Sequence, residues 1–169
     1  MIWNRLAVPK HRVISWLAIQ GRVKTADGLS QMDITSDTQC KLCCVHTESN
    51  QHLFFQCVYA QRTLKYVLDW LGFKSRLDQL ERSLMRLHSR RGKSKFQKQI
   101  YAAVITAGVY HVWWARNEVH WNMVVWRPEK LYRRIRECVV MRVSSVMPRK
   151  ISSKDIEWWE GVKQKVYNV

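Results

Sequence analysis

Apolar residues recur at helical spacing through most of this chain. Before residue 35 the pattern predicts two short helices. The first has Pro9 in its opening turn and Gly21 just past its end, and a second turn or helix follows Thr25, a candidate N-cap. The apolar positions of the first helix are Val13, Ile14, Trp16 and Leu17. The sequence therefore begins with a short amphipathic helix and a shorter companion.

Longer helices are predicted further along. One starts at Cys57 and is closed by Gly72, and another runs from about Ile100 to near Asn117. A third begins at Pro128 and ends before Pro148, and a terminal helix follows a cap at Ser152 or Ser153. These patterns predict a mainly α fold.

The stretch from Lys74 to Lys98 interrupts this pattern. It carries nine Lys and Arg residues against Asp78 and Glu81, and residues 90–95 show no apolar period. We interpret the stretch as an exposed, flexible basic linker. The chain is thus predicted to have three parts: residues 1–73, a basic linker over 74–98, and a helical, basic, Trp-rich C-terminal region over 99–169.

Four potential metal ligands lie in the first part. Cys40, Cys43, His52 and Cys57 have the spacing C-x2-C-x8-H-x4-C. The two-residue gap lets a tight turn place two sulfurs on one ion, and the four-residue gap suits a turn entering a helix. Three thiolates and an imidazole make a closed, tetrahedral structural Zn²⁺ site with no position open for catalysis. The sequence therefore predicts a zinc cofactor that staples residues 1–73, with buried thiols that bind no metal as the alternative.

Two neighbouring residues leave the ligand set partly open. Cys44 follows Cys43 directly, and consecutive side chains in a turn point apart, so one of the two binds and Cys43 is preferred. His46 is the alternative to His52. We prefer His52 because it opens the run His-Leu-Phe-Phe-Gln-Cys, which supplies the apolar surroundings of a structural site.

Basic residues are concentrated in the second half. The net charge is +16, and residues 1–73 hold 8 Lys/Arg and 5 Asp/Glu whereas residues 74–169 hold 21 and 8. Such a field attracts polyanions, so nucleic acid, as RNA or single-stranded DNA, is the leading partner, with acidic proteins or anionic lipid behind it. The alternative is a solvated basic face with no dedicated partner. The candidate nucleic-acid-binding residues are Arg86, Arg90, Arg91, Lys93, Lys95, Lys98, Lys130, Arg133 and Arg134.

Tryptophans are unusually frequent in the C-terminal part. We expect Trp113, Trp114, Trp121 and Trp126 to pack in the core and between helices, with a platform that stacks on unpaired bases as the alternative.

The cysteine count and the apolar segments bear on the compartment. Five cysteines, an odd number, and no visible signal peptide indicate a reducing interior, the nucleus or the cytoplasm. Residues 100–115 are too short and too interrupted for a bilayer, so no membrane partner is expected.

A series of short motifs surrounds the cysteines. They are Trp3-Asn4, Val8-Pro9-Lys10-His11, Trp16-Leu17-Ala18, Gly21-Arg22-Val23-Lys24-Thr25, Leu29, Cys40-Lys41-Leu42-Cys43, Glu48 and His52-Leu53-Phe54-Phe55-Gln56-Cys57. Together, over residues 3 to about 73, they resemble the zinc-binding domain that follows the polymerase in plant LINE-type (non-LTR) retrotransposon reverse transcriptases. Trp114-Ala115-Arg116-Asn117 resembles a signature of the segment that often trails this domain. Two positions depart from the family: Leu64 replaces a common tryptophan and Ser49 a usual threonine.

The resemblance implies a role in holding template or element RNA, or the DNA target, beside a polymerase during target-primed reverse transcription. Its implied partners are a reverse transcriptase or a host protein, and the chain looks like the tail of a larger polyprotein. The alternative is a protein-interaction scaffold or a degenerate retroelement remnant without autonomous function.

No enzyme activity is expected. The chain lacks the Asp-Asp pair with which a polymerase holds two metals. Asp27, Asp33, Asp37 and Glu48 are scattered along the sequence, which disfavours a ribonuclease H site, and Cys138 lies on an apolar helix stripe where an inert thiol is expected.

Overall fold

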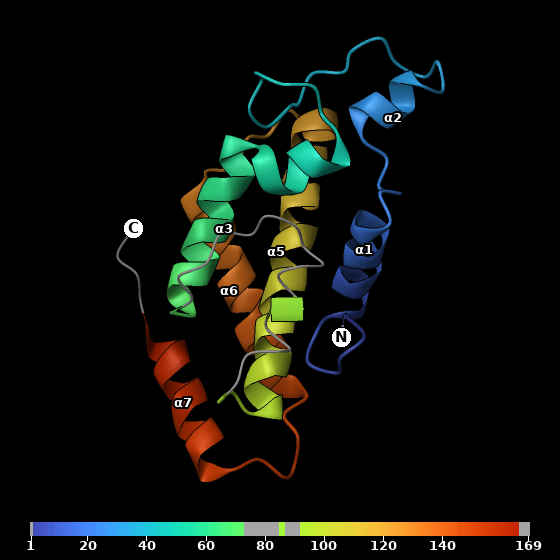
Figure 1. Ribbon diagram of the computed structural model, residues 1–169. Helices are drawn as coiled ribbons and strands as arrows, with labels where there is room; N and C mark the ends of the chain where they lie inside the picture. Colours follow the sequence, from blue (N-terminus) through green and yellow to red (C-terminus); the bar gives the residue numbers. More distant parts are fainter. Residues whose placement is uncertain (1, 73–84, 87–91, 166–169) are drawn as a thin grey trace.

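The computed structural model describes residues 2–72, 85–86 and 92–165, which are mainly helical and contain no β-strand (Figure 1). The helices are α1 (Pro9–Ile19), α2 (Ala26–Ser30), α3 (Val58–Trp70), α5 (Lys95–Asn122), α6 (Pro128–Ser145) and α7 (Ser153–Gln164), with a π-helical turn, η1, over His52–Gln56. The predicted mainly α fold is confirmed.

Helix α5 differs most from its predicted bounds. It begins at Lys95, inside the range assigned to the linker, because the Ser94 hydroxyl caps it by accepting from the Gln97 amide at 3.1 Å. It ends at Asn122, not near Asn117, where Met123 adopts a left-handed conformation. Residues 74–84 and 87–91 of the linker lie outside the described residues, and the division into three parts stays a prediction.

Helix α5 is the centre of the molecule (Figure 1). Helices α1 and α6 pack along it, and α3 packs against both α5 and α6. One hydrophobic cluster joins residues from both halves of the sequence, among them Leu6, Phe54, Val67, Ile105 and Ile135. The region of the cysteines therefore shares its core with the C-terminal helices. None of the helices in the described ranges combines the length and apolarity that crossing a bilayer requires.

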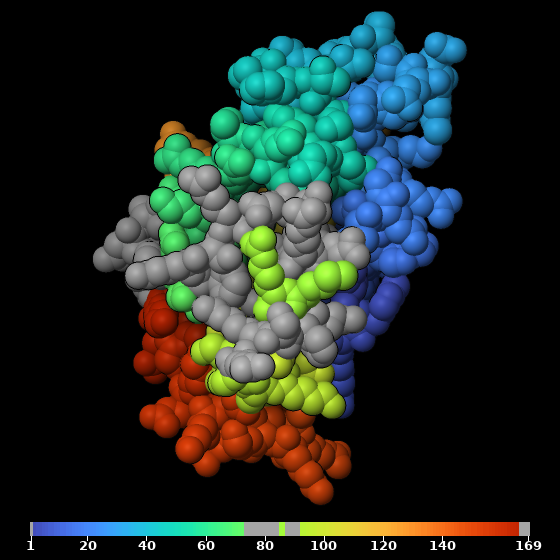
Figure 2. Space-filling model, in the orientation of Figure 1, coloured from blue at the N-terminus to red at the C-terminus, as the bar shows by residue number. Residues whose placement is uncertain are grey.

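Helix α7 lies at the opposite end of the molecule from the cysteine loop (Figure 2). It is held by Trp159, which is fully buried with its ring 6.5 Å from that of Trp70 at the end of α3. The indole nitrogen of Trp70 donates to the carbonyl of Val162 at 2.9 Å. The hydroxyl of Ser94 donates to the carboxylate of Asp155 at 2.7 Å, which ties α7 to the start of α5.

The expectation of tryptophan core packing holds in part for the four residues named. Trp113, Trp114 and Trp126 are half-buried, but Trp121 is 74% exposed. Trp121 lies in the last turn of α5, past the predicted end of that helix near Asn117, and faces solvent.

Gly108 marks the closest approach of α5 to α3. A Cβ added there would lie 2.8 Å from Cδ2 of Leu64, which is buried and has little room to move. We expect Gly108→Ala to lower the free energy of unfolding, because overpacking costs about 1–3 kcal/mol and better helix propensity returns about 1 kcal/mol. Gly161→Ala in α7 is the matched control, since its Cβ meets no atom within 4 Å.

Chemical denaturation of both variants checks this expectation. Gly161→Ala should gain up to about 1 kcal/mol from helix propensity alone. A Gly108→Ala variant that is stabilised as much as Gly161→Ala would show that the contact between α5 and α3 is loose.

Candidate metal centre

The loop before η1 folds back on itself and forms the first half of the centre. The amide of Cys40 donates to the carbonyl of His46, and the amide of Glu48 donates to that of Thr38, both at 2.8 Å. The amide of Cys44 donates to the carbonyl of Cys40 at 2.8 Å, and Cys44 has a φ of 55°. This tight turn places the side chains of Cys40 and Cys43 on the same side of the loop.

The π-helical turn η1 forms the second half. The amide of Cys57 donates to the carbonyl of His52 at 2.7 Å, which closes the wide turn, and Ser49 accepts from the His52 amide at 3.0 Å. Because residues five apart adjoin in a π-turn, His52 and Cys57 come together. Cys57 is also the N-cap of α3, so its sulfur lies at a helix N-terminus that stabilises a thiolate.

The four side chains converge. Donor atoms of Cys40, Cys43, His52 and Cys57 all lie within 4.8 Å of one another, with Cys40 Sγ to Cys57 Sγ at 4.0 Å and Cys43 Sγ to His52 Nε2 at 3.3 Å. Tetrahedral zinc with its usual bond lengths sets S···S at about 3.8 Å and S···N at about 3.5 Å. The geometry fits zinc, with all four positions filled by protein.

The electrostatics of the cluster favour a bound cation. Burial lowers the pKa of His52, so its ring is neutral at pH 7, the form that binds a metal. The hydrogen bond from Cys40 lowers the pKa of Cys57, whereas that same bond, together with burial, raises the pKa of Cys40. Two buried sulfurs thus share one proton, and a divalent ion is what allows all the thiols to ionise together.

The two alternative ligands do not belong to the cluster of four converging side chains. Cys44 is exposed, with its sulfur 3.8 Å from the Lys41 carbonyl oxygen. His46 is exposed too, and its ring centroid lies 5.3 Å from that of His52. The structure therefore gathers the four preferred ligands and leaves these two at the surface.

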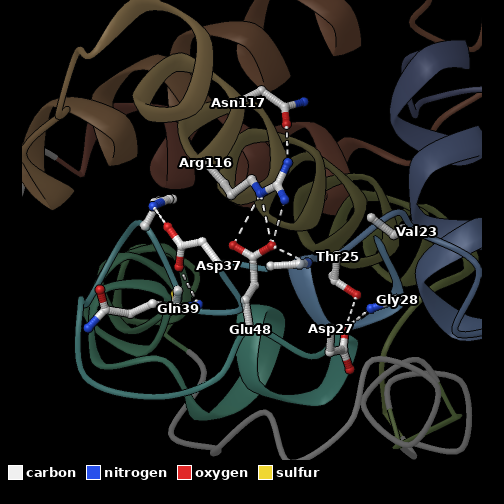
Figure 3. A network of polar contacts seen from close by, with 12 residues as sticks. Val23, Thr25, Asp27, Gly28, Asp37, Gln39, Glu48, Arg116 and Asn117 are labelled. Atoms are coloured by element: carbon white, nitrogen blue, oxygen red, sulfur yellow. Dashed lines mark hydrogen bonds and ion pairs between the residues drawn. The ribbon is translucent and has the colours of Figure 1, made fainter. Parts of the chain in front are cut away.

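A buried ion pair joins the metal loop to α5 (Figure 3). Glu48 is fully buried, and its carboxylate accepts from Arg116 Nε at 3.0 and 3.1 Å and from Nη2 at 2.7 Å. The same carboxylate accepts from the amide of Ala26 at 3.0 Å, at the start of α2. Both charged residues stand in motifs singled out from the sequence, but no spacing signal pairs residues 68 positions apart.

The candidate nucleic-acid-binding residues are spread over the described surface. Arg86, Lys95, Lys130, Arg133 and Arg134 are exposed, Lys93 and Lys98 are half-buried, and Arg90 and Arg91 lie outside the described residues. Lys130, Arg133 and Arg134 share α6. The guanidinium of Arg134 lies 4.4 Å from the ring centroid of Trp114 and 5.5 Å from that of Trp126.

A second cluster, which sequence reasoning missed, lies between α1, α5 and α6. His11, His111 and Cys138 each place a donor atom within 4.8 Å of the others, beside a pocket of about 330 Å³. Burial lowers the pKa of His11 to about 3 and that of His111 to about 4, so both rings are neutral at pH 7. The sequence feature that could have indicated this cluster is His111, which interrupts the apolar residues of α5.

Comparison with known proteins agrees with the first cluster. Residues 1–63 match the protein family described as zinc-binding in reverse transcriptase, and this range includes all four clustered ligands. No curated protein and no solved structure matches the chain. The family match and the donor geometry together fit the predicted zinc cofactor.

Proposed function

We propose that this chain is a zinc-stabilised nucleic-acid-binding module of a LINE-type reverse-transcription machinery. In this proposal it holds RNA or single-stranded DNA beside a reverse transcriptase and has no catalytic activity of its own. The family match over residues 1–63 supports the association with reverse transcription, and the excess of basic residues after residue 73 supports a polyanionic partner.

The observation that carries the proposal is the basic surface of α6. Lys130, Arg133 and Arg134 are exposed, and Arg134 lies against two half-buried indole rings. Proteins that bind single strands without sequence preference combine cations that track the phosphates with aromatic rings that stack on bases. Helix α6 supplies the cations, and Arg134 lies beside the indole rings of Trp114 on α5 and Trp126 just before α6.

The metal centre and the carboxylates support a binding role. A zinc ion held by four protein ligands has no position for a substrate or water, so its effect is to stabilise the loop. Three of the acids before η1 are engaged separately: Glu48 with Arg116, Asp27 with Thr25, and Asp37 with Lys41 (Figure 3). No carboxylate belongs to either potential metal cluster found in the described part of the chain.

The test is the salt dependence of binding to single-stranded RNA. Each phosphate contact releases counterions, so the logarithm of affinity should fall linearly with the logarithm of salt, by about 0.7 per contact. The double variant Lys130→Gln/Arg133→Gln should reduce this slope by about 1.4 and leave zinc content and helicity intact. Fluorescence anisotropy at several salt concentrations measures the slope.

Arg22→Gln/Lys24→Gln is the matched control, because it removes the same charge from an exposed site before residue 73. It should leave the slope close to that of the unaltered chain. Equal slopes for both double variants would contradict a binding surface on α6, and no binding to RNA or single-stranded DNA at low salt would overturn the proposed function.

A protein-interaction scaffold is the second candidate. The segment at the end of α5 exposes Trp121, Met123 and Val125 together, with Met123 82% exposed. Exposed apolar side chains in a contiguous segment are typical of a surface that another protein covers. Loss of partner binding in Trp121→Ser with unchanged RNA affinity would favour this role.

A further inference from the structure

We propose that His11, His111 and Cys138 form a second transition-metal site, with three protein ligands and a fourth position open to the adjoining pocket. Each ligand comes from a different helix, α1, α5 and α6. The site is separate from the four-ligand zinc centre and goes beyond the nucleic-acid-binding role proposed above.

The helices bring the three donors together without help from a loop. One donor atom from each residue lies within 4.8 Å of the others, and the two imidazole rings meet edge to face with centroids 5.2 Å apart. Helices α1 and α6 both pack directly on α5. A site built on packed helices keeps its ligands in place before the ion arrives, which reduces the cost of binding.

The ring of His111 is oriented for metal binding. Its Nδ1 lies 2.8 Å from the carbonyl oxygen of Ala107. A carbonyl can only accept, so Nδ1 carries the proton, and the neutral ring keeps a lone pair on Nε2. Metal-binding histidines are held in this way, with the second nitrogen donating to a backbone carbonyl.

His11 has a buried ring nitrogen that lacks a hydrogen-bond partner and could bind an ion. The residue is 1% exposed, and its Nε2 is buried with no hydrogen-bond partner among the described residues. A buried polar atom without a partner costs stability, and native structures seldom leave one without a reason. The ring stacks on Tyr110 with centroids 4.4 Å apart, which holds its plane in place.

The donor set selects the class of ion. Two imidazoles and a thiol suit zinc, cobalt or copper and are poor ligands for Mg²⁺ or Ca²⁺, which take oxygen. Three protein ligands leave one tetrahedral position, and the pocket of about 330 Å³ supplies the space for it. This arrangement differs from the first centre, where protein fills every position.

The charges around the pocket predict a weaker site. Lys10 and Arg134 line it and repel a cation, whereas Glu137 attracts one; burial raises the pKa of the Cys138 thiol, so a metal ion must displace its proton. Lys10 and Arg134 also lie over the rings of Tyr110 and Trp114, at 5.0 and 4.4 Å from the centroids. We therefore expect the second ion to bind less tightly than the first and to carry an anionic fourth ligand.

The test uses the full chain purified with one equivalent of zinc and titrated with Co²⁺. Zinc outcompetes cobalt at nitrogen and sulfur ligands, so the first centre keeps its zinc and cobalt reports on the second. We expect one equivalent of Co²⁺ to bind with a thiolate-to-cobalt charge-transfer band and the intense visible bands of tetrahedral coordination. A mild chelator should remove this ion before the zinc.

Variants assign the ligands. Cys138→Ser should abolish the charge-transfer band and weaken cobalt binding at least tenfold, and because Cys138 is half-buried, circular dichroism should show unchanged helicity. His111→Gln should also lose the cobalt. Cys44→Ser removes an exposed thiol outside both clusters and should change nothing. Failure of the zinc-loaded chain to bind cobalt, or a charge-transfer band that survives Cys138→Ser, would overturn the proposal.

Discussion

Cys57→Ser is expected to lower the zinc content by one equivalent per chain and to unfold residues 36–60. Cys57 is fully buried at the N-cap of α3, and its Sγ lies 4.0 Å from that of Cys40. The other thiol and imidazole donors of the loop, Cys44 and His46, stand outside the cluster. Within this segment, residues 36–51 bury only Cys40 and Glu48, so this part has little apolar surface to offset its chain entropy. Structural zinc contributes about 10–16 kcal/mol in small zinc-binding peptides, which exceeds the stability of most domains.

Metal analysis and amide hydrogen exchange measure the two effects. Exchange protection should fall throughout residues 36–60 and persist where α5 packs on α1 and α6. Cys44→Ser is the control, because this exposed thiol lies outside the cluster and its loss should keep both zinc and protection. A Cys57→Ser chain that retains the zinc, or a loop that stays protected without it, would contradict the assignment.

Glu48→Gln is expected to lower the free energy of unfolding by about 3–5 kcal/mol. The change leaves the Arg116 guanidinium, whose side chain is 8% exposed, without its counter-ion in the interior. The carboxylate also accepts from the first turn of α2, so the metal loop, α2 and α5 all lose a shared anchor. Arg116→Met should lower the free energy of unfolding by a similar amount, because it leaves the buried carboxylate of Glu48 without a counter-ion.

Chemical denaturation of the single and double variants separates the energy of the ion pair from the cost of leaving one charge unpaired. Glu48→Gln/Arg116→Met should lose less than the sum of the single losses, since neither residue is then left as an unpaired buried charge. The control is Asp37→Asn, which removes an exposed ion pair with Lys41 and should have no measurable effect. A loss under about 1 kcal/mol in Glu48→Gln would place this pair among ordinary surface ion pairs.

The zinc prediction was possible from sequence because its information is local. Cys40 and Cys43 belong to one tight turn, and His52 and Cys57 belong to one π-helical turn, so spacing alone indicates which side chains adjoin. The same locality explains why the helix starts at Pro9 and Pro128 were predicted, since the first turn of a helix tolerates proline.

The C-terminal end of α5 could not be predicted from local sequence patterns. Apolar spacing placed this end near Asn117, whereas the helix continues to Asn122 and presents Trp121 to solvent. A helical period identifies a face but not whether a neighbouring helix is long enough to cover it. The start of α5 at Lys95 could have been predicted, because Ser94 is a typical N-cap residue. The basic residues around Ser94 instead led to the prediction of a linker.

Contacts between residues far apart in the sequence depended on tertiary packing. The pairing of Glu48 with Arg116 requires the metal loop and η1 to lie against α5, and the meeting of His11, His111 and Cys138 requires α1 and α6 to pack on α5. Sequence patterns specified the helices, their apolar faces and the ligands within single turns, because those properties follow from backbone period and nearest neighbours. Tertiary packing alone determines which buried polar groups meet, since that choice depends on the shape and burial of surfaces that belong to different elements of the chain.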